Sequence, residues 1–146
     1  MAFKVLTDLQ ADILNTLFEE GIGELGYYLT GGTALSEFYL QHRYSDDLDL
    51  FTREERSLKK DYEDLSKVLT HLGHEIISAE IDDQFIRLFL SPSETSREQL
   101  KIEFARDVPA MMSPANPFGK IVVDSFEDIA VNKICAILNR EPDLLR

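Results

Sequence analysis

The sequence predicts a mixed α/β (α+β) fold, in which helices flank a mixed β-sheet within a single domain over residues 1–146. Three observations support this class. Segments with helical periodicity alternate along the chain with segments of strand periodicity. Two of the strand segments enclose a polar loop, which indicates antiparallel pairing in part of the sheet. The chain has 146 residues, 44% of them hydrophobic, which is enough for one hydrophobic core.

The first elements can be placed from their caps and apolar stripes. A helix is expected from about Asp8 to Glu20, with Thr7 as its N-cap. A strand over Tyr27–Thr30 then runs into a glycine pair, and a second helix is expected from Ala34 to about Gln41. Further strands are expected over Leu48–Phe51, Glu75–Ile81, Gln84–Leu90, Leu100–Phe104 and Ile121–Val123, with the loop Ser91–Gln99 between the third and fourth of these. A helix is expected to end at about Leu72 with Gly73 as its C-cap, and a last helix over Ser125–Asn139. The segment Arg53–Lys60 is expected to be polar and solvated, and Pro109–Pro117 to be irregular.

The composition excludes several classes of protein. Asp and Glu number 27 against 15 Lys and Arg, so the formal net charge is −12 and nonspecific binding to duplex DNA is not expected. No apolar run approaches the roughly 20 residues that cross a bilayer, and the N-terminal segment lacks a signal peptide's apolar block. We therefore expect a cytoplasmic protein without a membrane partner. The one cysteine, Cys135, lies among apolar residues and is expected to be buried.

The segment Asp47-Leu48-Asp49 is the first candidate for chemistry. On a strand, residues i and i+2 point to one face, roughly 6.5–7 Å apart, so the two carboxylates would share a face while Leu48 and Leu50 point into the core. Carboxylates in this arrangement suit Mg²⁺ or Mn²⁺, and two such ions stabilise the attacking and leaving oxygens of nucleotidyl transfer. The alternative is a solvated edge strand with alternating acids.

The segment from Leu29 to Thr33, LTGGT, is the second candidate. A strand that runs into two glycines and a helix start leaves free backbone N–H groups, which suit a triphosphate. The hydroxyl of Thr33 would either cap the helix or bond a phosphate oxygen. Taken alone, Gly31-Gly32-Thr33 is more typical of a plain tight turn. The turn precedes the Asp-x-Asp strand by one amphipathic helix, however, so a phosphate cradle and a metal site would lie together.

Two more residues extend this candidate site. Residues 100–104 alternate in polarity, and Glu103 would either bind metal or accept a proton from an attacking hydroxyl. A surface Lys/Glu pair with Lys101 explains that pattern equally well. Lys133 lies on the apolar stripe of the last helix, between Ile129 and Ile137. It either extends along the edge of that stripe into water or points at an anion.

Together these motifs resemble the AbiEii/AbiGii-type nucleotidyltransferase toxins, a branch of the minimal nucleotidyltransferase superfamily. The matching segments are LTGGTALSEFYLQHRYSDDLDLF, KIEF and DIAVNKICAILNR, and the resemblance extends from Thr7 to Arg140. It implies a nucleotidyltransferase fold with a mixed sheet and flanking helices. It further implies nucleotide binding by Gly31, Gly32, Thr33 and Lys133, and catalytic, metal-binding roles for Asp47, Asp49 and Glu103.

The resemblance also implies an activity. Such enzymes move a nucleoside monophosphate from an NTP to an acceptor hydroxyl, on tRNA or protein, and act as the toxin of a toxin–antitoxin or phage-defence pair with a cognate antitoxin. Two departures stand out: Glu103 replaces a usual Asp, and the domain is expected to lack the family's C-terminal helical part. The alternative function is a non-catalytic nucleotide-binding or partner-binding module that retains the fold.

Overall fold

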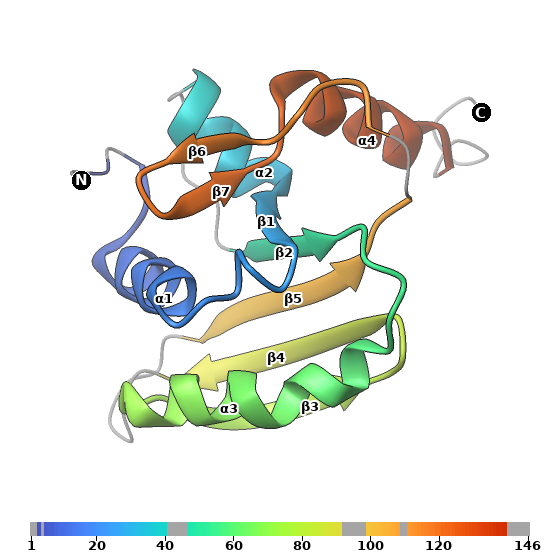
Figure 1. Ribbon diagram of the computed structural model, residues 1–146. Helices are drawn as coiled ribbons and strands as arrows, with labels where there is room; N and C mark the ends of the chain where they lie inside the picture. Colours follow the sequence, from blue (N-terminus) through green and yellow to red (C-terminus); the bar gives the residue numbers. More distant parts are fainter. Residues whose placement is uncertain (1–2, 4, 41–46, 92–98, 109–110, 140–146) are drawn as a thin grey trace, which may run out of the picture.

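The computed structural model of the chain describes residues 3, 5–40, 47–91, 99–108 and 111–139. Its strands form one mixed sheet flanked by helices, which confirms the predicted fold class (Figure 1). In chain order the elements are α1 (Asp8–Glu19), β1 (Tyr27–Thr30), α2 (Gly31–Ala34), the π-helix η1 (Leu35–Leu40), β2 (Leu48–Thr52), the 3₁₀ helix η2 (Leu58–Asp61), α3 (Tyr62–His71), β3 (Glu75–Ile81), β4 (Phe85–Ser91), β5 (Leu100–Arg106), β6 (Asn116–Phe118), β7 (Ile121–Val123) and α4 (Phe126–Asn139).

The seven strands are arranged in the order β3-β4-β5-β2-β1-β7-β6, so β2 lies in the middle. It pairs antiparallel with β1 and parallel with β5. β4 pairs antiparallel with both β3 and β5, as expected for strands that enclose a polar loop. Helix α3 lies at one end of the molecule and α4 at the other (Figure 1). The middle of the sheet is thus occupied by the strands that carry the predicted site.

The hydrophobic core lies on one face of this sheet. Alternate side chains of β2, β4 and β5 are buried and the intervening ones are half-buried. The buried set packs with apolar residues of α1 and α3 in one cluster. Its fully buried members include Ile13, Leu14, Leu17, Leu48, Leu50, Leu65, Leu69, Ile102 and Phe104. The opposite face of the same strands carries half-buried side chains, among them Asp49, Arg87 and Glu103.

Replacing Phe104 by Ala is expected to lower the free energy of unfolding by about 3–5 kcal/mol. Phe104 is fully buried in β5, and its ring meets that of Tyr27 edge-on at 5.5 Å. Chemical denaturation of the two proteins checks this. Ile77→Ala is the matched control, because Ile77 is 47% exposed and should cost less than about 1 kcal/mol. Equal losses in both variants would contradict the placement of β5 in the core.

The caps predicted for α1 and α3 are confirmed. The hydroxyl of Thr7 accepts from the Gln10 amide at 3.1 Å, and the Gln10 side chain accepts from the Thr7 amide at 3.0 Å, which is a capping box. Gly73, at φ 92°, ends α3 in a left-handed conformation. Its amide donates to Thr70 and that of His74 donates to Leu69, as in a Schellman motif.

Several local predictions were wrong. The second helix begins at Gly31 rather than Ala34, and it continues as a π-helix. The segment over Pro109–Pro117 was expected to be irregular, but residues 116–118 form the edge strand β6, where Pro117 needs no strand partner for an N–H. The segment after β2 is not simply solvated, because Leu58 is fully buried. Cys135 is exposed on α4 rather than buried.

Parts of some predictions lie outside the described residues. These parts are the helix end at Gln41, residues 92–98 of the predicted loop, Pro109, and the chain from Arg140 onward. In the part of the chain that the structure does describe, every helix is too short or too polar to traverse a bilayer.

Candidate active site

The pairing of three strands brings the two halves of the predicted site together. Thr30, the last residue of β1, lies opposite Asp49 on β2, and Asp49 lies opposite Glu103 on β5. The glycine pair follows Thr30 directly and therefore reaches the same place. A pocket of about 610 Å³ opens here, a volume typical of a small-molecule site. Its lining includes Gly31, Gly32, Asp49, Glu103 and Lys133, which are five of the seven predicted site residues.

Gly31 and Asp49 are in contact at the centre of this pocket. Gly31 has a φ of 78°, a left-handed conformation that other residues adopt only with strain. A Cβ at this position would overlap Oδ2 of Asp49 and lie 3.1 Å from its Cγ. Both the backbone conformation and the space therefore require glycine. The absence of a side chain lets the carboxylate of Asp49 lie directly against the turn.

The carboxylate of Asp49 is held in an unfavourable electrostatic environment. Burial, followed by the negative charges of Glu103 and Asp47, raises its pKa from 3.8 to about 6, while Lys101 opposes the rise. A cation between these acids would relieve the repulsion. Asp49 and Glu103 therefore have the chemistry of ligands for a hard divalent ion.

The other two carboxylates are engaged by cations of the protein. Nζ of Lys101 lies 3.3 Å from Oδ2 of Asp47, whose side chain is 46% exposed. Arg87 bridges Glu103, at 3.5 Å, and Glu80, at 3.2 Å. Within the described ranges no three Asp, Glu, His or Cys side chains converge closely enough to hold a metal ion. Asp49 and Glu103 fit a divalent ion in their chemistry, whereas Asp47 is paired with Lys101.

The remaining two predicted residues differ in their placement. Lys133 is an exposed residue of α4 and lines the pocket. Thr33 is 1% exposed and does not line it. Its hydroxyl donates to the main-chain oxygen of Asp47, which ties the turn to the start of β2. The helix-cap position expected for Thr33 is occupied by Thr30 instead, whose hydroxyl makes no cap hydrogen bond.

The sequence around this site matches a known family. Residues 12–146 match the family of nucleotidyl transferase AbiEii toxins of type IV toxin–antitoxin systems. The chain belongs to the AbiEii family. It is the family that the sequence resembles. No curated protein matches this AbiEii-family chain.

Solved structures show the same fold. A protein of Helicobacter pylori assigned as a nucleotidyltransferase is 18% identical, with a TM-score of 0.61 over 89% of this chain. JHP933, also from Helicobacter pylori, is 21% identical, with a TM-score of 0.59 over 88% of the chain. MenT4, a nucleotidyltransferase toxin of Mycobacterium tuberculosis H37Rv, is 21% identical, with a TM-score of 0.61 over 88% of the chain. The AbiEii-family chain spans 60%, 54% and 51% of these proteins, respectively.

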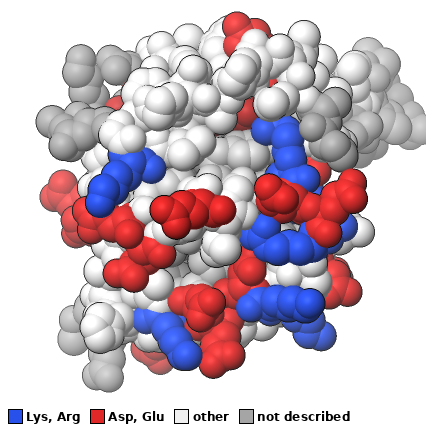
Figure 2. All heavy atoms as spheres, viewed as in Figure 1, with Lys and Arg blue, Asp and Glu red and all other residues white. Residues whose placement is uncertain are grey.

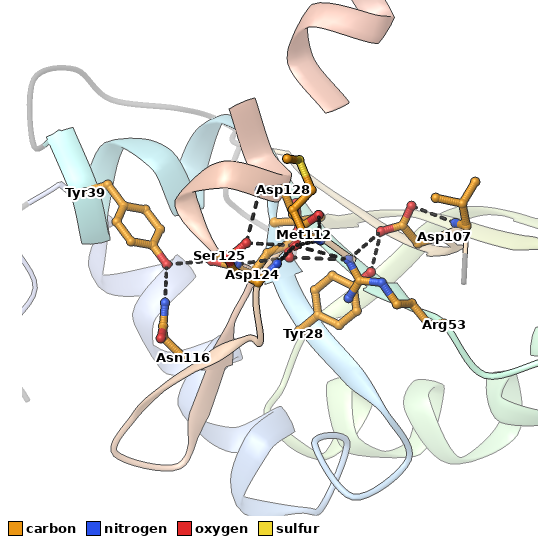
Figure 3. A network of polar contacts seen from close by, with 12 residues as sticks. Tyr28, Tyr39, Arg53, Asp107, Met112, Asn116, Asp124, Ser125 and Asp128 are labelled. Atoms are coloured by element: carbon orange, nitrogen blue, oxygen red, sulfur yellow. Dashed lines mark hydrogen bonds and ion pairs between the residues drawn. The ribbon is translucent and has the colours of Figure 1, made fainter. Parts of the chain in front are cut away.

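The structure also reveals a buried polar network beside the pocket that sequence reasoning missed (Figure 3). Its centre is Arg53, the residue after β2, whose side chain is only 17% exposed. Nη2 of Arg53 lies 3.4 Å from Asp107, 3.6 Å from Asp124 and 3.9 Å from Asp128. We call these four residues the Arg53 cluster. The sequence pattern that indicates the position of Arg53 is the period of two from Asp49 through Phe51 to Arg53. On a strand this period places all three side chains on one face.

Charge is distributed unevenly over the face seen in Figure 2. Acidic and basic side chains alternate over the lower two thirds of the face seen in Figure 2, whereas its upper part is mostly uncharged. Helix α4 contributes apolar side chains that are largely exposed in the described structure. These are Phe126 at 42%, Val131 at 39%, Ile134 at 56%, Ile137 at 47% and Leu138 at 52%.

Proposed function

We propose that this AbiEii-family chain transfers a nucleoside monophosphate from an NTP to an acceptor hydroxyl in a divalent-metal-dependent reaction. The observation that carries the proposal is the single pocket that combines the Gly31-Gly32 turn with the neighbouring carboxylates Asp49 and Glu103. A triphosphate needs backbone N–H donors and positive charge, whereas its metal needs carboxylates. Both requirements are met within one cavity.

The phosphate-binding part of the pocket is formed by the turn and by α4. Gly31 and Gly32 present main-chain groups without side chains in the way, so phosphate oxygens approach closely. Lys133 supplies a flexible positive charge from the wall of the pocket. Thr33 holds the turn against β2 through Asp47 and supports the phosphate site from behind. We assign the β- and γ-phosphates to this part.

The carboxylates form the metal-binding part. Asp47, Asp49 and Glu103 would hold Mg²⁺ or Mn²⁺, which supplies charge neutralisation at the reacting phosphate when bound. Asp49 and Glu103 are already neighbours across the β2–β5 ladder. Glu103 is paired with Arg87 and Asp47 with Lys101, and both carboxylates would give up these ion pairs to hold the metal.

The reaction is a single displacement at the α-phosphorus. The acceptor oxygen forms a bond to this phosphorus while the bond to the β-bridging oxygen breaks, and pyrophosphate leaves with the electron pair. The acceptor's proton passes to a carboxylate of the site, for which Glu103 is suited because its side chain is 23% exposed at the pocket. A hydroxyl of tRNA or of a protein is the acceptor, and a cognate antitoxin is the expected partner.

Incubation with labelled NTPs, Mg²⁺ and either total RNA or total protein tests this function. Label is expected to appear in one acceptor fraction, and EDTA is expected to prevent it. Absence of label from both fractions with all four NTPs would contradict the proposal.

Removing the positive charge of Lys133 should weaken the binding of the NTP substrate. Lys133→Ala is expected to raise KM for the NTP about tenfold, because one charged contact to phosphate is lost. Steady-state kinetics over a range of NTP concentrations measures the effect. Lys120→Ala is the control, since Lys120 is exposed between β6 and β7 and does not line the pocket. A KM unchanged in the Lys133 variant would remove this residue from the site.

A second candidate function is a nucleotide-binding module without turnover. Its support is the pairing of Asp47 with Lys101 and of Glu103 with Arg87, which occupies two of the three carboxylates. Calorimetry separates the two candidates when it is combined with the labelling assay. Binding of NTP with Mg²⁺ and no label in any acceptor favours the module, whereas label that depends on metal excludes it.

A further inference from the structure

The Arg53 cluster joins three segments that end beside the pocket. Asp107 follows β5, Asp124 follows β7, and Asp128 lies in the first turn of α4. The guanidinium carbon of Arg53 also lies over the ring of Tyr28, 4.6 Å from its centre. A single cation from the end of β2 therefore contacts the ends of two other strands and the start of a helix (Figure 3).

The three carboxylates are fixed in place by neutral donors. Asp107 accepts from the Tyr28 hydroxyl at 2.5 Å, and Asp124 accepts from the Thr30 hydroxyl at 3.0 Å. Asp128 accepts from the Ser125 hydroxyl at 2.8 Å and from the Met112 amide at 2.9 Å. These hydrogen bonds restrict the three carboxylates. The carboxylates hold the guanidinium of Arg53 between them, and its charge keeps them close together.

Helix α4 is attached to the rest of the protein at its N-terminal end, where this cluster lies. Ser125, which precedes the helix, and Asp128 and Ile129 in its first turn are at most 6% exposed. Among the described side chains beyond Ile129, none is fully buried, and Val131, Ile134, Ile137 and Leu138 are exposed. The helix is thus held mainly at its N-terminal end. Lys133 lies one turn beyond Asp128 and Ile129 and lines the pocket. The attachment of the helix at these two residues therefore determines the position of the Lys133 ammonium group at the pocket.

We infer that Arg53 is a positioning residue, which fixes α4 against the sheet and so holds Lys133 over the phosphate part of the pocket. The inference rests on the proposed function for its link to nucleotide binding. Arginine differs from lysine at this position because its planar group lies over the ring of Tyr28, 4.6 Å from its centre, whereas a lysine ammonium is a point charge without a stacking face. Asp107 and Thr30 also line the pocket, so the same cluster shapes its wall.

The test compares Arg53→Lys with Arg56→Lys. Arg56 is a matched control, because it also lies over a tyrosine ring, that of Tyr27, and pairs with an aspartate, Asp61, at 2.9 Å. None of these three residues lines the pocket. Both changes remove the same kind of contacts, so general destabilisation affects both variants. Displacement of α4 is expected only in Arg53→Lys.

Two measurements are made on both variants. The first is binding of an NTP with Mg²⁺ by calorimetry, in which Arg53→Lys is expected to weaken binding on the order of 10- to 100-fold, with Arg56→Lys within about twofold of the wild type. In a Lys133→Ala background the effect of Arg53→Lys should fall to about twofold, because the two residues act through one contact. The second is amide hydrogen exchange, in which α4 should exchange faster in Arg53→Lys than in Arg56→Lys.

The outcomes are distinguishable. A wild type that binds no NTP defeats the proposed function, and hydrogen exchange of α4 then still decides the inference about Arg53. Equal nucleotide affinity and equal exchange of α4 in the two variants would overturn the inference. Full additivity with Lys133→Ala would overturn the link between Arg53 and Lys133. If Arg53→Lys fails to fold, Asp128→Asn, which keeps the shape of the side chain and removes one charge of the cluster, is measured in its place with the same expectations.

Discussion

Replacing Asp49 by Asn is expected to lower the transfer rate on the order of 10³-fold while making the metal-free protein more stable at pH 8. The rate falls because Asn keeps the shape of the side chain and loses the charge that would hold the metal. The stability rises because the carboxylate of Asp49 is half-buried and repelled by Glu103 and Asp47, so its ionised form is disfavoured by the fold.

The sign of the pH dependence follows from the pKa of Asp49. The folded state raises this pKa from 3.8 to about 6, so the folded protein holds the proton more tightly than the unfolded chain does. The stabilising effect of that proton is complete at a pH below the pKa of Asp49 in the unfolded chain. It is lost as the pH rises through the pKa of Asp49 in the folded protein. The Asp49→Asn variant avoids this loss, whose upper bound is about 3 kcal/mol. The advantage of the variant should therefore be large at pH 8 and small below pH 4.

Thermal unfolding in EDTA between pH 4 and pH 8 measures the stability difference, and the labelling assay measures the rate. Glu63→Gln is the control for removal of a charge, because Glu63 is 78% exposed in a surface pair with Lys67 and contributes little. Adding Mg²⁺ should stabilise the wild type and leave the stability of Asp49→Asn unchanged. A variant that transfers as fast as the wild type would exclude Asp49 from the metal site.

Replacing Gly31 by Ala is expected to abolish detectable nucleotide binding. The added Cβ would overlap Oδ2 of Asp49. Residue 31 also has a φ of 78°, a left-handed conformation that alanine adopts only with strain. Either the turn or the carboxylate has to move, and each movement separates the phosphate part of the pocket from its metal-binding part. The loss of binding should exceed about 100-fold, since misplacement of reacting groups by about 1 Å has effects of that size.

Gly73→Ala separates this steric effect from backbone strain. Gly73 also has a left-handed conformation, with a φ of 92°, but a Cβ there meets nothing within 4 Å. Both variants should lose about 1 kcal/mol of stability from strain. Nucleotide binding, measured by calorimetry, should be lost only in Gly31→Ala. Normal binding by that variant would show that Asp49 does not need to lie against the turn.

Sequence patterns predicted the parts of the fold that depend on local chemistry. Thr7 and Gly73 cap their helices as expected, because capping is decided by a few neighbouring residues. The alternation in residues 100–104 puts Ile102 and Phe104 on one side of the strand, and the structure buries both of them. Of the seven residues predicted for the site, five line one pocket, because a glycine turn and an acidic strand can each be recognised from sequence.

The remaining features depend on partners far apart in the chain. Arg53 was assigned to a solvated segment, since an arginine after a strand is usually exposed, and its burial results from Asp107, Asp124 and Asp128. Thr33 was expected to cap a helix or bind phosphate, but its hydroxyl donates a hydrogen bond to the carbonyl of Asp47. Cys135 was expected to be buried from its apolar neighbours, whereas α4 is packed only at its beginning. The period-two pattern in β2 indicates the face on which Arg53 lies, but no local pattern identifies its partners Asp107, Asp124 and Asp128.

The backbone pairing of Thr30 with Asp49 has a consequence for how such a site can change over time. The turn and the acidic strand are aligned by main-chain hydrogen bonds between β1 and β2. Insertions or deletions between Leu40 and Asp47 should therefore leave the two halves in register.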